Sequence, residues 1–215
     1  MKTRYRTIYK MGEDEILIKK SRFIGYAMPV ETEDEAIKFI EEIKTKHRDA
    51  THNVYAYVLG EDNNIQRYSD DGEPSGTAGI PALEVIKKED LRNVAVVVTR
   101  YFGGKKLGTG GLIRAYTKGA KIGLEAGVII DKILFRKVKV RIDYTLYGMV
   151  KNYLINKGIY IEDTIFDDAV NLILYIEYEK DEKFRDTVRG LTNGTGIIDD
   201  IGEEYLSISD GKILK

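Results

Sequence analysis

In the first half of the chain, segments with the residue pattern of strands alternate with segments that have the apolar spacing of helices. Stretches rich in β-branched and aromatic residues predict strands, and apolar residues three or four positions apart predict helices. The expected strands are residues 4–10, 15–30 with an interruption near Ser21, 52–59 and 65–69 as a hairpin, and 93–101. The expected helices run from the capping-box pattern at 32–35 to about Lys46, from Pro81 to about Lys88, and from about Leu112 to Ala126. Because glycine inside a helix costs about 1 kcal/mol relative to alanine, Gly119 and Gly123 predict close packing of the last helix on a sheet.

The second half of the chain has a different rhythm. Its expected strands are residues 135–145, 159–166, 169–178 and 203–209, and its expected helices are 146–157 and 182–191. The two central strands pair as a hairpin around Asp167 and Asp168. A β-α-β-β-α-β order is typical of the ferredoxin-like fold, in which two helices cover one face of an antiparallel sheet. We therefore expect an α+β chain of two domains, residues 1–134 and residues 135–215.

A glycine-rich loop joins a predicted strand to a predicted helix in residues 99–114, which read TRYFGGKKLGTGGLIR. Glycines leave backbone N–H groups unscreened, and the loop ends where the unpaired N–H groups of a helix N-terminus lie. Together with basic side chains, such groups attract anions, phosphate above all. The residues expected to bind phosphate or RNA are Arg100, Tyr101, Gly103, Gly104, Lys105, Lys106, Gly108, Gly110, Gly111 and Arg114.

A second irregular loop, residues 70–79, is rich in glycine and acidic residues. It also follows a predicted strand, so the acidic loop can complement the basic one if the two meet. The residues expected to face the basic loop are Arg67, Asp70, Asp71, Gly72, Glu73, Pro74, Gly76 and Thr77. The alternative is structural: Asp70 and Asp71 pair with Arg100 or Arg114 and merely fix the two loops.

Charge and composition narrow the function classes. The whole chain is near neutral, with 34 basic and 35 acidic residues, yet residues 91–124 hold seven basic residues and no acidic one. Residues 135–215 carry a net charge of −3, from 12 basic and 15 acidic residues, so the first domain is the expected phosphate-contacting part. Cysteine is absent, which excludes disulfides, thiolate metal sites and cysteine nucleophiles and fits a cytoplasmic protein. No apolar run approaches membrane-spanning length, so we expect no membrane partner.

Two stretches of the sequence resemble the motifs of a known family. Residues 67–81 read RYSDDGEPSGTAGIP, and residues 97–112 read VVTRYFGGKKLGTGGL. In this order and at this separation they resemble the YigZ/IMPACT family over most of residues 15–130. The resemblance implies an N-terminal domain with the fold of the second domain of ribosomal protein S5. It also implies a ferredoxin-like domain similar to the last domain of elongation factor G.

The same resemblance bears on function. The eukaryotic relative acts in translational control by binding an activator of a stress-sensing kinase, and small-molecule kinases share the S5-like fold. For bacterial members the resemblance supplies no settled activity. It therefore points toward translation without assigning a reaction.

Three functions fit these features. The basic loop, with Tyr101 and Phe102 beside Arg100 and Tyr116 beside Arg114, suits binding of RNA or the ribosome. A nucleotide or other small phosphate ligand is the second possibility, with phosphoryl transfer if Asp70, Asp71 and Glu73 hold magnesium, although the loop lacks the spacing of a Walker motif. The third is a protein-interaction module in translational or stress control.

Hydrolase chemistry is disfavoured. Ser75 lies in no nucleophile elbow, and His47 and His52, the two histidines, lack the spacing of a zinc site. We expect a cytoplasmic RNA- or ribosome-binding protein that modulates translation without a metal or cofactor, and the sequence favours a binding protein over an enzyme.

Overall fold

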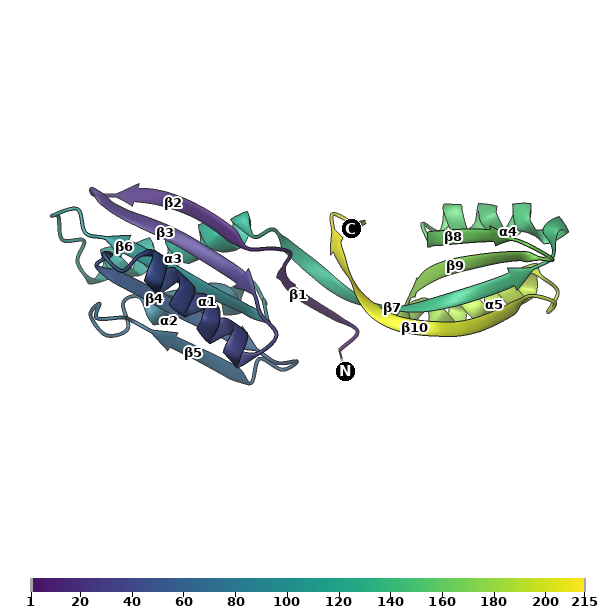
Figure 1. The fold of residues 1–215 in the computed structure, drawn as a ribbon, viewed down its shortest axis with the longest axis horizontal. Helices are drawn as coiled ribbons and strands as arrows, with labels where there is room; N and C mark the ends of the chain where they lie inside the picture. Colours follow the sequence, from purple (N-terminus) through teal and green to yellow (C-terminus); the bar gives the residue numbers. More distant parts are fainter. Residues whose placement is uncertain (1, 215) are drawn as a thin grey trace. The chain divides into compact units, whose positions relative to one another are not determined.

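The computed structural model describes residues 2–214, which divide into two compact units (Figure 1). The first unit contains residues 5–131, and the second contains residues 2–4 together with the chain from Lys132 onward. Each unit combines helices with an antiparallel sheet, which confirms the α+β class and the two-domain organisation. The expected boundary at residue 134 falls inside strand β7 (Ile129–Ile142), which begins in the first unit and ends in the second.

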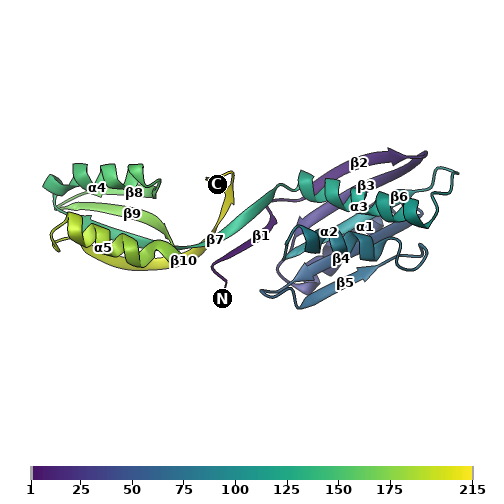
Figure 2. The same cartoon turned by 180° about the vertical axis from the view of Figure 1, so that it is seen from behind.

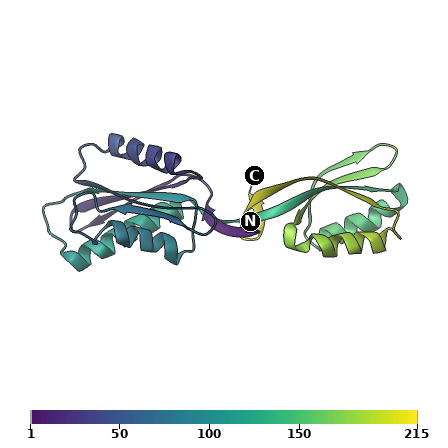
Figure 3. The same ribbon diagram turned by 90° about the horizontal axis from the view of Figure 1, so that it is seen from below.

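In the first unit, a five-stranded sheet lies between helices on both faces (Figure 3). Its strands, in the order β2-β3-β6-β4-β5, are β2 (Gly12–Ile18), β3 (Ser21–Pro29), β6 (Val94–Tyr101), β4 (His52–Leu59) and β5 (Ile65–Ser69). Helix α1 (Glu33–Lys46) covers one face, and α2 (Gly79–Lys88) and α3 (Thr109–Ala126) cover the other. Strand β6 is apolar on both sides because it is central: Val96 and Val98 face α2 and α3, and Ala95 and Val97 face α1.

Helix α3 packs tightly on the sheet through glycines. A Cβ at Gly25 of β3 would lie 1.9 Å from the carbonyl oxygen of Gly119, and a Cβ at Gly123 would lie 2.8 Å from the carbonyl carbon of Gly25. A Cβ at Gly119 would lie 2.6 Å from Cγ1 of Val98. The close packing predicted from Gly119 and Gly123 is therefore confirmed, and it fixes the position of the start of α3 relative to β6.

In the second unit, the element order is that of the ferredoxin-like fold. Strand β7 is followed by α4 (Tyr144–Asn156), β8 (Tyr160–Phe166), β9 (Val170–Glu177), a 3-10 turn (Tyr178–Lys180), α5 (Asp181–Leu191) and β10 (Ile197–Ser209). The sheet order is β11-β10-β7-β9-β8, where β11 (Lys212–Leu214) is an added edge strand, and β1 (Arg4–Ile8) also pairs with β7. Both helices pack on one face of this sheet, where Val138, Leu172 and Phe184 are buried (Figure 3). The predicted β-α-β-β-α-β order is confirmed.

Several boundaries differ from those expected. The run 15–30 is a hairpin, β2 and β3, whose strands meet at a two-residue turn after Ile18. Helix α3 begins at Thr109, three residues before the expected start, because Gly108 takes the N-cap position with a φ of +73°. As a result Gly110 and Gly111 lie in the first helical turn and not in the loop. Strands β7 and β10 begin earlier than expected, at Ile129 and Ile197.

Candidate functional site

The end of β6 lies where three connections meet at one end of the first unit. Arg100 and Tyr101 are the last residues of β6, and in the sheet they pair with the first residues of β3 and of β4. Three connections therefore gather there: the β2–β3 turn, residues 102–108 (the basic loop) and residues 70–78 (the acidic loop). Figure 1 and its reverse view, Figure 2, show these connections at the same end of the sheet.

The two loops meet at a buried carboxylate. Oε1 of Glu73, in the acidic loop, lies 2.5 Å from a terminal guanidinium nitrogen of Arg100 and accepts a 2.7 Å hydrogen bond from the Tyr116 hydroxyl of α3. Nε2 of His52, the first residue of β4, lies 3.7 Å from the same oxygen. We call these four residues the Glu73 cluster. Three of them are almost fully buried, with exposed fractions of 8% for Glu73, 5% for Arg100 and 0% for Tyr116.

The protein surrounds the charged and hydrogen-bonding groups of the Glu73 cluster closely. The guanidinium of Arg100 lies 5.4 Å from the ring centres of both Phe23 and Phe102, and its Nε has no hydrogen-bond partner among the described residues. Burial and the neighbouring Glu73 carboxylate raise the pKa of Tyr116, so its hydroxyl stays a proton donor. A buried carboxylate with a guanidinium and a hydroxyl donor is satisfied, whereas one that has lost its cation is not.

The sequence prediction for Tyr116 was wrong, and Arg100 has a different environment from the expected one. Tyr116 was expected to offer a stacking surface beside Arg114, but its side chain is fully buried against the sheet because position 116 lies on the inner face of α3. Arg100 is bound to Glu73 and is scarcely exposed. Neither side chain therefore offers a surface to a macromolecule.

The acidic loop uses its carboxylates to bind backbone N–H groups. The Asp70 carboxylate accepts hydrogen bonds of 2.8 to 3.0 Å from the N–H groups of Gly76, Ala78 and Gly79, which starts α2 two residues before Pro81. The Asp71 carboxylate accepts a 2.6 Å bond from the Asn53 N–H. The expected pairing of these two aspartates with Arg100 or Arg114 is therefore replaced by the Glu73 pair.

The other predicted residues of the acidic loop have local roles. The Thr77 hydroxyl donates to the carbonyl of Pro74, and Nδ1 of His52 lies 2.7 Å from the Asp71 carbonyl oxygen. Gly72 and Gly76 have φ values of +86° and +76°. Arg67 lies on β5 beside Glu33 of α1, 3.5 Å away, and so turns away from the basic loop.

The basic loop is docked on one side and open on the other. The Phe102 N–H donates to the Thr51 hydroxyl at 3.0 Å, and the Gly103 N–H donates to the Ser21 hydroxyl at 3.1 Å. Gly104 and Gly108 have φ values of +80° and +73°, and a Cβ at either would meet nothing within 4 Å. The glycines therefore give the loop its conformation while leaving its outer side unobstructed.

Three predicted basic residues remain available on this open side. Lys105, Lys106 and Arg114 are exposed, and within residues 2–214 none of them forms an ion pair. Helix α3 begins among them without a side-chain cap, since its N-cap residue is Gly108. Unpaired N–H groups and three free cations thus adjoin one another at the start of α3.

Tyr101 belongs to a second polar network at the same end of the sheet. Its hydroxyl lies 2.9 Å from Nδ1 of His47 and 3.2 Å from a carboxylate oxygen of Asp49. On the other side of the imidazole, Nε2 lies 2.7 Å from the Tyr26 hydroxyl, which donates to Glu13. Sequence reasoning missed this role of His47, because only its place at a helix end was visible. Burial first, and then the Lys46 ammonium, lower the pKa of His47.

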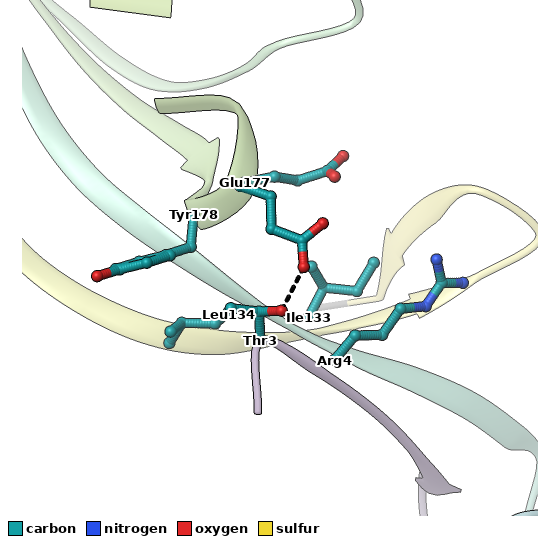
Figure 4. A pocket seen from close by; sticks show the side chains of 7 residues that line it. Thr3, Arg4, Ile133, Leu134, Glu177 and Tyr178 are labelled. Carbon is teal, nitrogen blue, oxygen red and sulfur yellow. Dashed lines mark hydrogen bonds between the residues drawn. The ribbon is translucent and has the colours of Figure 1, made fainter. Parts of the chain in front are cut away.

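Within residues 2–214, no three His, Cys, Asp or Glu side chains are placed to hold a metal ion, and no described helix is both long and apolar enough to span a bilayer. In the second unit a cavity of about 40 Å³ lies beside the hydrogen bond from Thr3 to Glu179 (Figure 4). A space of that size holds a few water molecules and no substrate.

The comparisons with known proteins agree with the two-unit organisation. The model of the Impact N-terminal domain matches residues 19–124, and that of a domain of unknown function, DUF1949, matches residues 140–195. The IMPACT family member YvyE of Bacillus subtilis is 45% identical over 94% of this chain and 93% of its own length. An IMPACT family member of Haemophilus influenzae is 36% identical, over 86% and 92%. A crystal structure of a hypothetical protein has a TM-score of 0.59 at 27% identity and covers 94% of this chain and 99% of its own.

The chain belongs to the IMPACT family, as the motifs at 67–81 and 97–112 predicted. Both motifs lie within the matched residues 19–124. The Glu73 cluster and the basic loop are therefore built from the stretches that carry the family resemblance.

Replacing Glu73 tests whether the cluster holds the two loops together. In Glu73→Gln the buried Arg100 guanidinium loses its counter-charge. We expect the free energy of unfolding, measured by urea titration, to fall by about 3 kcal/mol. The control Glu84→Gln loses a carboxylate that pairs with Lys87 on the surface, and should change stability by less than about 1 kcal/mol. Equal effects of the two substitutions would contradict a clamping role.

His47 predicts a pH dependence of stability. Because its pKa is lowered in the folded state, the unfolded chain binds the proton more tightly. Stability is therefore complete above pH ~6.5, the ordinary pKa of histidine, and falls as the pH drops below it. Between pH 7.5 and 5.5 we expect the free energy of unfolding to decline less in His47→Gln than in the unaltered protein. Identical slopes for the two proteins would refute this assignment.

Proposed function

We propose that this protein binds RNA, with the ribosome as its site of action, by contacting backbone phosphates with the basic loop and the start of α3. The observation that supports the proposal most strongly is the exposure of Lys105, Lys106 and Arg114, without ion-pair partners among the described residues, around an uncapped helix N-terminus. Cations and free N–H groups of this kind bind phosphate oxygens.

Among the described residues, the neighbouring acidic groups do not form ion pairs with the three exposed cations. Residues 91–124 contain no acidic residue. Glu73 is buried and paired with Arg100, and Asp70 is occupied by three backbone N–H groups. The acidic loop therefore supports the site mechanically, and its carboxylates bind donors of the protein itself and not the three exposed cations.

The same facts weaken the case for phosphoryl transfer. Asp70, Asp71 and Glu73 are the carboxylates of this end of the unit that a magnesium ion would need. Each already accepts hydrogen bonds from the protein, and Glu73 faces a guanidinium. Binding of a phosphate-bearing partner without chemistry on it is the simpler use of this geometry, and the proposal requires no cofactor.

Translation is the process that the resemblance favours. The S5-like and elongation-factor-like folds implied by the sequence motifs occur in proteins that contact ribosomal RNA, which supports the ribosome as the first RNA to test. A protein partner in translational control is the alternative that the family resemblance keeps open. An exposed Phe102 beside the cations would suit base stacking.

Sedimentation with ribosomes over a salt series tests the proposal. The variant Lys105→Ala/Lys106→Ala/Arg114→Ala removes the three exposed cations and leaves Arg100 in place, because loss of Arg100 would unpair Glu73. We expect the unaltered protein to co-sediment at low salt and this variant to lose that affinity. The plot of log affinity against log salt should become less steep by about 2 units.

A matched control removes three charges elsewhere in the same unit. Lys38, Lys87 and Lys88 are exposed on α1 and at the end of α2. The variant Lys38→Ala/Lys87→Ala/Lys88→Ala should bind ribosomes like the unaltered protein. No co-sedimentation of the unaltered protein at low salt, or equal losses in the two triple variants, would overturn the proposal.

A further inference from the structure

The turn between β2 and β3 has an unusual composition for its geometry. It consists of Lys19 and Lys20, with φ values of +46° and +70°, between the paired residues Ile18 and Ser21. Two-residue turns with positive φ at both positions favour Asn-Gly or Gly-Gly, because a side chain with a Cβ costs about 1–2 kcal/mol in the left-handed region. This turn instead carries two lysines.

The double-lysine turn is the surface on which the basic loop is docked. A Cβ at Gly103 would lie 1.9 Å from the carbonyl oxygen of Lys20 and 2.5 Å from the Ser21 nitrogen, so only glycine allows this approach. The Gly103 N–H also donates to the Ser21 hydroxyl. The turn and the loop are therefore backbone neighbours, and Lys105 and Lys106 follow the contact residue Gly103 by two and three positions.

The two lysine side chains of the turn are available for binding a ligand. Lys19 and Lys20 are both exposed, and neither forms an ion pair within residues 2–214. Of the three acidic residues of the adjoining strand β2, Glu15 pairs with Arg22, Glu13 pairs with Lys46, and Asp14 accepts a hydrogen bond from the Glu15 N–H. The turn thus adds two uncompensated cations to Lys105 and Lys106.

We propose that the double-lysine turn is the second half of the phosphate-binding surface, and that the ligand is consequently an extended RNA backbone and not a single phosphate or a mononucleotide. This inference rests on the proposed function and specifies the class of ligand that the site binds. One phosphate needs only the start of α3. Two loops with two lysines each, side by side on an open surface, match a polyanion with successive phosphates.

The decisive variant is Lys19→Asn/Lys20→Gly. It removes both charges and installs the residues that suit the left-handed conformation, so the fold should be as stable as before or more stable. Its affinity for ribosomes, and for polyuridylate as a structureless RNA, should fall about ten-fold at moderate salt. The salt plot should become less steep by roughly 1.5 units, as expected for two lost phosphate contacts.

Two further variants separate charge from turn geometry. Lys19→Arg/Lys20→Arg keeps the charges and should bind like the unaltered protein. Lys87→Gln/Lys88→Gln removes two charges at the end of α2, next to the start of β6 and thus at the opposite end of that strand, and should also bind normally. The affinity for ATP, the mononucleotide probe, should be low and should not change when the two lysines of the turn are replaced.

The outcomes distinguish this inference from the function on which it rests. If the Lys105/Lys106/Arg114 variant loses RNA and the Lys19→Asn/Lys20→Gly variant does not, the inference is overturned and the proposed function stands. If ATP binds as tightly as RNA, an extended ligand is likewise excluded. If the unaltered protein binds no RNA at low salt, both proposals fail.

Discussion

The buried contact of Glu73 with Arg100 and Tyr116 is the interaction on which the rest of this end of the molecule depends. It joins the acidic loop, the end of the central strand β6 and the inner face of α3 at one carboxylate oxygen. A buried ion pair of this kind adds little net stability compared with an apolar contact, but removing one partner is costly. Its value here is positional, since the contact fixes two irregular loops that have little regular hydrogen bonding of their own.

A second consequence concerns charge. By pairing Glu73 internally and occupying Asp70 with backbone N–H groups, the fold withdraws negative charge from a surface that keeps its lysines exposed. The close contact of Gly103 with the backbone of Lys20 then brings the turn of β2 and β3 against the basic loop. The same arrangement thus pairs the carboxylates inside the site and leaves the lysines exposed outside it. The proposed binding of a polyanion relies on this separation.

Much of the fold was predictable because its signals are local. The capping box at 32–35, the alternation of β4 and the apolar run of β6 each depend on neighbouring residues, and the structure confirms the helix and strands they predicted. From the sequence, only the opposite charges of the two loops indicated that they meet. Which carboxylate meets Arg100 depends on chain geometry: Asp70 is nearer the free N–H groups of α2, and Glu73 reaches the guanidinium. The double-lysine turn was missed because positive φ values without glycine leave no clear pattern in the sequence. The burial of Tyr116 had a signal that was not used, since it lies three residues before Gly119 on the same face of α3.

The most direct measurement is the reactivity of individual lysines toward an acetylating reagent, read by mass spectrometry with and without ribosomes. If an RNA backbone lies across the turn and the basic loop, Lys19, Lys20, Lys105 and Lys106 should all become several-fold less reactive in the complex. Lys87 and Lys88, exposed at the end of α2, should react equally in both states. Unchanged reactivity of the four site lysines in a sample that does bind ribosomes would contradict the account, because the contact would then lie elsewhere on the protein.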